Sequence, residues 1–369
     1  MTQGMTMQEQ KETEGADDKV KKLRRRILPP DEGCMEQARA HWMTVGKPLF
    51  SLGKLEDAVI QMAGIKRSAD YTLEKKALVI LCADNGIVAE GVTQTGQEVT
   101  AIVAENFTKG AASTNIMAEV AGVDIFPVDI GMAKDVSGLT VNEKKVVRGT
   151  KNFAKEPAMS RQEVWKAIET GIGIVKELKE KGYDVIATGE MGIGNTTTSS
   201  AVASVLLRKD PEEVTGKGAG LTSEGLRRKI RVIREAIRMH EPEAQDVPDV
   251  LSKVGGLDIA GMTGLFLGGA LYHVPIVIDG FISAVAALCA VRIVPNAAGY
   301  VLPSHVSAEP AGAMILEALH LTPFLTCDMC LGEGSGAVAV MPLLEMGLQV
   351  YRKMGSFSDI QVEQYQILK

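Results

Sequence analysis

The densest group of residues able to do chemistry is the segment at residues 189–198, which reads GEMGIGNTTT. Its glycines let the backbone approach a ligand closely, and Asn195 with the three threonines after it can cap a helix and donate hydrogen bonds. A helix N-terminus presents free amides and the positive end of a dipole, which suits a phosphate. The segment matches neither a Walker loop nor the G-x-G-x-x-G dinucleotide pattern. An ordinary strand-to-helix turn fits the same residues.

Four acidic residues, Asp84, Asp129, Glu190 and Asp279, follow short apolar runs, and each lies near a glycine. Such runs are typical of strands in a parallel sheet, where ligands bind outside the carboxyl ends. The acids are therefore expected to line one polar crevice. An acid at this position also commonly caps the next helix. We assign the capping role to Asp129, whereas Glu190 and Asp279 fit capping and ligand contact equally well.

Two further glycine-rich segments each bring one charged group. GKGAG at residues 216–220 precedes a basic helix that contains Lys229. Its ammonium group could neutralise a phosphate, although a surface lysine is the common alternative. GEGSG at residues 332–336 places Glu333 between two glycines in a loop, where a carboxylate can project into a crevice as a general base.

Other kinds of catalytic site are not indicated. Cys327 and Cys330 have C-x-x-C spacing, but no second pair or histidine cluster accompanies them, so we expect buried thiols rather than zinc. His305 lies in a polar loop, where ligand contact and a structural role both remain open. There is no nucleophile elbow of the G-x-S-x-G kind. We expect neither a metal nor a cofactor.

The elements that must position these groups alternate along the chain. Strands are predicted at residues 77–82, 123–128, 185–187, 275–278 and 338–341. Helices are predicted over residues 34–65 with a break at 46–48, over residues 160–182 behind a capping box, and over residues 223–240. This alternation predicts an α/β fold with a doubly wound parallel sheet and a smaller helical part from both chain ends. We divide the chain into a charged, frayed segment (1–30), a helical segment of the smaller part (31–70), a large α/β domain with the substrate sites (71–320), and a catalytic loop, last strand and C-terminal helix (321–369).

Composition excludes several classes of protein. The 369 residues include 40 Lys and Arg against 46 Asp and Glu, a net charge of −6, without the basic block that nucleic acid requires. No apolar run reaches the roughly 18 residues of a membrane span. The charged first residues lack the apolar centre of a signal peptide. With five cysteines and no secretion signal, a cytoplasmic protein with reduced thiols is expected.

In their order along the chain, these segments resemble the nicotinate-nucleotide–dimethylbenzimidazole phosphoribosyltransferase family. The resemblance runs from about residue 47 to residue 350. Its landmarks are SLGKLE at 51–56, CAD at 82–84, EGV at 90–92, VTA at 99–101, EPAMS at 156–160, GEMG at 189–192, NTT at 195–197, LSKVGG at 251–256, GMTG at 261–264, DGF at 279–281, PSH at 303–305 and LGEGSGA at 331–337. Each segment alone is common, but their shared order is specific.

The resemblance implies an activity. Such enzymes move the phosphoribosyl group of nicotinate mononucleotide to a nitrogen of 5,6-dimethylbenzimidazole, a lower-ligand base of cobamides. The products are nicotinate and α-ribazole 5′-phosphate, with inversion at the anomeric carbon. The leaving nicotinate is a pyridinium and needs no acid, whereas the azole must lose its N–H proton, so one carboxylate base is enough. The resemblance also implies a Rossmann-like large domain, a small helical domain built from both chain ends, and a homodimer.

Site residues follow from the same resemblance. The general base falls on Glu333. Contacts to the mononucleotide fall on Glu190, Met191, Gly192, Ile193, Gly194, Asn195 and Thr196, with Lys229 and Ser307 near the phosphate and Asp279 and Gly280 completing the substrate contacts. The aromatic base lies in a pocket that corresponds to Thr95, Ile102, Met191 and Leu331. Glu190 or Asp279 could stabilise positive charge that develops on the ribose.

Several departures from the family pattern gather around the acceptor. Ile102 stands where many relatives carry a glutamine that faces the aromatic base, Asn85 where they often have histidine, and Thr95 is followed by Gly96 instead of proline. Benzimidazoles, purines and phenols therefore all remain open as acceptors. Two other functions are a nicotinamide dehydrogenase, disfavoured by the missing fingerprint, and a nucleotide-binding partner subunit without activity, which should lack Glu333.

Overall fold

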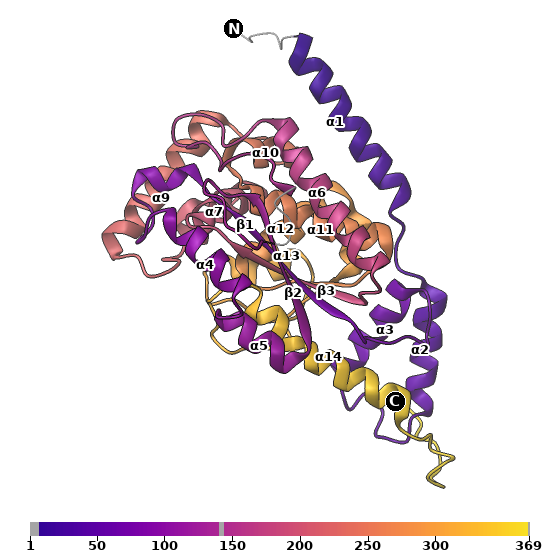
Figure 1. Ribbon diagram of the computed structural model, residues 1–369. Helices are drawn as coiled ribbons and strands as arrows, with labels where there is room; N and C mark the ends of the chain where they lie inside the picture. Colours follow the sequence, from indigo (N-terminus) through magenta and orange to yellow (C-terminus); the bar gives the residue numbers. More distant parts are fainter. Residues whose placement is uncertain (1–6, 140–143, 368–369) are drawn as a thin grey trace.

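The computed structural model describes residues 7–139 and 144–367 and is built around a five-stranded, all-parallel sheet (Figure 1). The spatial order of the strands is β2-β1-β3-β4-β5. Their bounds are Lys76–Ala83 for β1, Val123–Gly131 for β2, Val185–Met191 for β3, Ile276–Val277 for β4 and Val301–Leu302 for β5. The order 2-1-3-4-5 is one of the two common doubly wound arrangements, and it differs from the dinucleotide-binding order 3-2-1-4-5-6.

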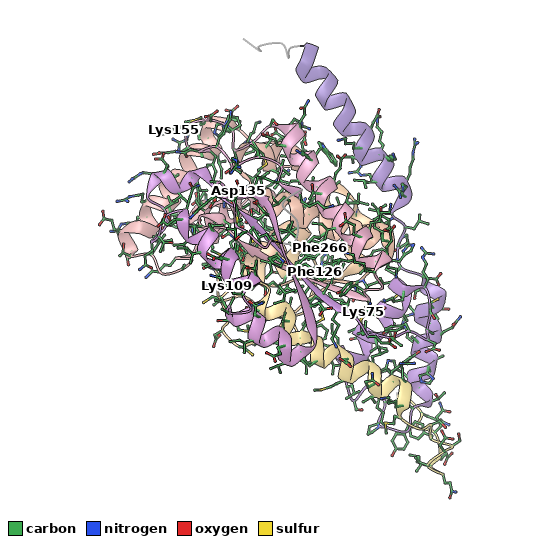
Figure 2. All side chains as sticks on the ribbon, viewed as in Figure 1. Lys75, Lys109, Phe126, Asp135, Lys155 and Phe266 are labelled. Carbon is green, nitrogen blue, oxygen red and sulfur yellow. The ribbon has the colours of Figure 1, made fainter. Side chains whose placement is uncertain are left out.

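Helices cover both faces of the sheet, and the central strand β1 is therefore buried along its whole length. Alternate residues point to opposite faces, so Val79 and Leu81 enter one apolar core while Leu78 and Ile80 enter the other. The first core is completed by α6 (Arg161–Glu180), α7 (Asn195–Leu207), α9 (Ser223–His240), α10 (Val247–Val254), α11 (Leu257–Tyr272), α12 (Phe281–Ile293) and α13 (Ala311–Ala318). The second contains residues of α2 (Glu32–Thr44), α3 (Lys54–Lys66), α4 (Glu98–Thr108), α5 (Ser113–Ala121) and α14 (Ser335–Lys353). Figure 2 shows Phe266 in the middle of the molecule and Lys109 and Lys155 at its periphery.

The first four predicted strands are confirmed, and the fifth is wrong. Residues 338–341 lie inside α14, while the real fifth strand, Val301–Leu302, was not predicted. A short apolar run reads alike in a strand and in a helix buried on all sides. Val338, Val340 and Met341 are all buried, so the first turns of α14 lack the polar face that would have identified a helix.

The predicted helices are also found. The pattern over residues 34–65 becomes α2 and α3, and the basic pattern becomes α9 over Ser223–His240. Ser160 accepts the N–H of Glu163, and the Glu163 carboxylate accepts the N–H of Ser160, which completes the capping box of α6. A side-chain cap of this kind stabilises a helix by about 1 kcal/mol.

The prediction of a frayed N-terminal segment is wrong for most of that segment. Residues Met7–Arg26 form α1, which projects from the body in Figure 1 and has its acidic residues early and its basic residues late. That distribution complements the helix dipole. Leu23 is buried, Lys19 pairs with Glu169 at 2.8 Å, and the Arg24 side chain donates to the carbonyl of Ile293 at 2.8 Å. The end of α1 is thus attached to the large α/β part.

Candidate active site

A cavity of about 280 Å³ lies at the carboxyl ends of β3, β4 and β5. Eleven residues predicted to contact substrate line it: Glu190, Met191, Gly192, Ile193, Asn195, Thr196, Asp279, Gly280, Ser307, Leu331 and Glu333. The sheet places them together because parallel strands end at one edge. Phe281, Ile282, Ser283 and Glu309 also line the cavity and were not predicted. The signal for residues 281–283 was position alone, since they directly follow the polar strand end at Asp279, whereas no signal in the sequence pointed to Glu309.

Glu190 lies at the end of β3 in a buried group of acids. The side-chain amide of Asn195, the first residue of α7, donates to Glu190 Oε2 and to Asp258 Oδ2, the latter at 3.2 Å. Burial, together with the charges of Asp258 and Asp279, raises the pKa of Glu190 to about 8. Burial likewise raises the pKa of Asp258 to about 6. These surroundings favour the protonated form of Glu190, which can donate a hydrogen bond.

The glycine-rich turn after β3 is fixed from both sides. The N–H of Ile193 donates to Thr100 Oγ1 at 3.1 Å, and its carbonyl accepts the side-chain amide of Asn85 at 3.3 Å. A Cβ on Gly192 would lie 2.3 Å from the carbonyl oxygen of Ala83, so only glycine fits there. The turn leads into α7, whose first residues Asn195 and Thr196 line the cavity. A helix N-terminus at a cavity wall is a favourable place for an anion.

Lys229 lies just behind this wall and is fully buried. Its Nζ donates to Thr196 Oγ1 at 2.8 Å and to the carbonyl of Gly216 at 3.2 Å. Burial lowers the pKa of this ammonium group to about 8, and the charge of Glu309 opposes that shift. A desolvated cation next to a helix N-terminus adds to the positive potential at the cavity wall. The alternative of a surface lysine is wrong.

Glu333 lies in the loop before α14, as predicted. Three consecutive residues, Gly332, Glu333 and Gly334, have left-handed backbone angles with φ of 83°, 61° and 84°. The half-buried carboxylate accepts a hydrogen bond from Thr114 Oγ1 at 3.4 Å. Burial is the main cause that raises the pKa of Glu333, and the charge of Asp279 adds to it. A carboxylate with a raised pKa at a cavity wall is suited to accept a proton.

Asp279 and Asp129 serve structural contacts. Asp279 is 2% exposed, and both its carboxylate oxygens accept backbone N–H groups at the start of α14. Asp129 does not cap a helix, because it accepts the N–H of Met132 at 2.8 Å and pairs with Lys145 at 2.8 Å. The carboxylate of each residue is thus held within the fold.

Comparison with known proteins decides the family. A sequence model described as "Phosphoribosyltransferase" matches residues 27–362. The nicotinate-nucleotide–dimethylbenzimidazole phosphoribosyltransferase of Ruminiclostridium cellulolyticum is 49% identical over 335 residues, covering 91% of this chain and 95% of the relative. That of Acetivibrio thermocellus is 48% identical over 332 residues, covering 90% and 95%. The chain belongs to this phosphoribosyltransferase family. The crystal structure of CobT from Thermus thermophilus superposes with a TM-score of 0.84 at 35% identity, covering 90% of this chain and all of that one.

Four residues that the phosphoribosyltransferase pattern assigns to the site do not line the cavity: Thr95, Ile102, Gly194 and Lys229. Gly194 shapes the turn with a φ of 95°, and Lys229 contacts the cavity wall through its hydrogen bond to Thr196. Thr95 is exposed and Ile102 is 54% exposed, on or beside α4. Their assignment to the acceptor pocket stays a prediction.

Histidine and cysteine residues complete the site. His305 lines the cavity, is 4% exposed, and contacts Ser304 Oγ through Nδ1 at 3.2 Å. Cys330 also lines the cavity, and both it and Cys327 are exposed, so the prediction of buried thiols is wrong.

Across the described ranges, no group of three or more His, Cys, Asp or Glu side chains could hold a metal ion. Nor does any helix in those ranges have the length and apolar character to cross a membrane.

Proposed function

We propose that this chain transfers the phosphoribosyl group of nicotinate mononucleotide to a lower-ligand base, 5,6-dimethylbenzimidazole or a related azole, in cobamide synthesis. The observation that carries this proposal is that one cavity contains both the N-terminus of α7, backed by Lys229, and the carboxylate of Glu333. The first arrangement suits the donor phosphate, and the second suits removal of the acceptor proton. The family's own activity requires the same two tasks.

The chemical step needs one base. The unprotonated nitrogen of the azole attacks C1′ of the ribose, and the C1′–N bond to nicotinate breaks with its electron pair moving to the pyridinium nitrogen. Nicotinate therefore leaves as a neutral ring. The N–H proton of the azole passes to Glu333, and attack opposite the leaving group inverts the anomeric carbon. A positioned base of this kind contributes about 10²–10⁴-fold to the rate.

The donor is held by the turn and helix that follow β3. Its phosphate lies against the amides from Gly192 to Thr196, with Lys229 supplying charge and Ser307 a hydroxyl. Glu190, as a neutral acid, donates a hydrogen bond in the bound complex and gives up its proton only if positive charge on the ribose favours the carboxylate. The burial of Lys229 and Glu190 supports this arrangement, because desolvated polar groups interact more strongly than exposed ones.

The acceptor lies between Met191 and Leu331, with Thr95 and Ile102 at its outer edge. Ile102 gives this edge more apolar character than a glutamine would, so acceptors with few polar substituents are favoured. The intact Glu333 argues against a partner subunit without activity. Family membership argues against the dehydrogenase.

The assembly is proposed to be a cytoplasmic homodimer whose smaller helical domain comes from both chain ends. Residues of α2, α3 and α14 share one apolar core with the sheet, and the buried Lys47–Glu56 pair at 2.5 Å fixes the connection between α2 and α3. Ile116 and Val120 on α5 are 60% and 85% exposed and offer apolar surface for a second copy. Light scattering after size exclusion should give twice the chain mass; a monomeric mass at assay concentration would contradict the dimer.

The deciding experiment is a panel of acceptors. Purified protein is incubated with nicotinate mononucleotide and, separately, 5,6-dimethylbenzimidazole, unsubstituted and methoxylated benzimidazoles, adenine, and phenol or p-cresol. Products are identified by mass. Release of nicotinate with a benzimidazole riboside phosphate supports the proposal, and a preference for phenols would assign the chain to the phenol-activating members. If no acceptor releases nicotinate, the transferase function is wrong.

A further inference from the structure

The first turn of α14 is capped by a carboxylate from a distant strand. The first N–H groups of a helix have no partners within the helix and need acceptors from elsewhere. Asp279 Oδ1 accepts the N–H of Gly336 at 2.7 Å and of Ala337 at 3.3 Å, and Oδ2 accepts that of Gly334 at 3.0 Å. The cap therefore holds both the helix start and the residue directly after Glu333.

Asp279 is itself fixed at the end of β4. Its N–H donates to Ser283 Oγ at 3.1 Å, and its carbonyl accepts the hydroxyl of Ser304 at 2.8 Å. Ser304 follows β5, so two strand ends and the first turn of α14 are joined through one residue. Both carboxylate oxygens are occupied by backbone donors, which leaves this side chain better placed to hold the protein than to hold a ligand.

The loop that carries Glu333 needs such a support. Glu333 has a left-handed φ of 61°, which residues with a side chain disfavour. Such a backbone conformation persists only where the surrounding structure enforces it. The loop lies directly on β3, since a Cβ on Gly189 would be 2.9 Å from the Glu333 carbonyl oxygen. Beyond Glu333, the N–H groups of Gly334 and Gly336 attach the chain to the end of β4 through Asp279.

We propose that Asp279 is a positioning residue for the reaction: by capping α14 it holds the backbone of Glu333 so that this carboxylate faces the acceptor. The role rests on the proposed function and differs from direct contact of Asp279 with the substrate. Displacing a reacting group by about 1 Å can cost roughly 10²-fold in rate, although the group itself remains present. Loss of the cap should therefore impair the chemical step and spare the donor site.

The test is Asp279→Asn, which keeps the shape but places an amide donor against one of the N–H groups. We expect kcat to fall about 10- to 100-fold while the Kd of nicotinate mononucleotide changes less than about threefold. When Glu333→Gln is already present, Asp279→Asn should lower kcat by less than about a further threefold, because Asp279 acts through Glu333. The positioning role would be overturned if weaker donor binding accounted for the loss of activity. It would also be overturned if Asp279→Asn lowered kcat equally with and without Glu333→Gln.

A second variant and a second readout cover other outcomes. Ser304→Ala removes the hydrogen bond to the Asp279 carbonyl and should lower kcat less than Asp279→Asn does, with donor Kd again unchanged. The control is Thr263→Val, which removes a buried hydroxyl within α11 and should leave kcat unchanged. Hydrogen exchange of residues 330–340 should accelerate in Asp279→Asn whether or not the enzyme turns over. Unchanged exchange contradicts the cap. An inactive parent enzyme with accelerated exchange in the variant would instead reject the proposed function.

Discussion

The two sides of the cavity that we propose for the donor and the acceptor are built differently. On the donor side, Ile193, Thr196 and Lys229 are tied to other elements by hydrogen bonds of 2.8–3.3 Å, and Lys229 is fully buried. On the side proposed for the acceptor, Leu331 lines the cavity and is 53% exposed, and Ile102, which lies outside the cavity on α4, is 54% exposed. In the proposed arrangement, the donor, which is common to every reaction, binds a preorganised network of hydrogen bonds, whereas the acceptor, which varies, binds beside exposed side chains. Donor affinity should accordingly depend on a few buried groups, and acceptor preference on exposed ones.

The largest expected effect falls on Glu333, where the two sides meet. Glu333→Gln keeps the shape but cannot accept the azole proton, so kcat should fall by about 10²–10⁴-fold. The donor Kd should stay the same, because the phosphate contacts lie elsewhere. Steady-state kinetics with calorimetric titration of the donor test both statements, with the exposed Glu317→Gln as control. Turnover within a few-fold of the parent would show that another group, with Glu190 the next candidate, removes the proton.

The donor side is tested at its buried cation. Lys229→Met keeps the aliphatic chain and removes the charge. A charge-assisted contact contributes about 1.5–3 kcal/mol, so donor affinity should fall roughly 10- to 100-fold. The matched control is Arg231→Met, which removes an exposed cation from the same helix. If calorimetry finds equal donor affinity in both variants, Lys229 does not serve the phosphate and the donor side is less specialised than its burial indicates.

The pH dependence of stability tests how strongly the donor side is desolvated. The pKa of Glu190 rises from its ordinary value of 4.5 to about 8 in the fold. Because the native state holds this proton more tightly than the unfolded chain does, the stabilisation is complete below about pH 4.5 and is lost as pH rises toward 8. Asp258, whose pKa is raised to about 6, acts in the same direction.

Glu190→Gln should remove most of this dependence. Each pKa unit corresponds to about 1.4 kcal/mol, so the parent should lose on the order of a few kcal/mol relative to the variant across this window. Denaturant unfolding of the ligand-free protein at several pH values measures the difference, with the exposed Glu235→Gln as control. Parallel pH profiles for parent and Glu190→Gln would mean that Glu190 is ionised and solvated in the free site.

Much of this site could be predicted from strand ends and glycines. Glu190, Asp279 and Glu333 were candidates because apolar runs precede the first two and glycines flank the third, and the family resemblance then assigned their roles. The sequence could not decide between capping and ligand contact for Asp279, or between a phosphate partner and a surface residue for Lys229. Each choice depends on partners far along the chain. Asp279 accepts the N–H of Gly334, 55 residues later, and Lys229 donates to Thr196, 33 residues earlier. The strand predicted at residues 338–341 failed for a related reason, because burial on all sides of α14 comes from tertiary packing.

The smallest expected effect, and the one that separates the two sides, concerns Ile102. It is more than half exposed on α4, while Thr100, two residues earlier, is buried and fixes the donor turn through Ile193. Ile102→Gln introduces a polar group at the outer edge without touching that hydrogen bond. We expect kcat/KM to change a few-fold in favour of acceptors with hydrogen-bonding substituents, such as adenine over dimethylbenzimidazole, with donor Kd unchanged. Thr100→Val should instead weaken donor binding and leave the ranking of acceptor substrates unchanged. The reason is that it removes the hydroxyl oxygen that accepts the Ile193 N–H. An unchanged acceptor ranking in Ile102→Gln would remove Ile102 from the pocket, and altered donor affinity in that variant would show that the two sides are not independent.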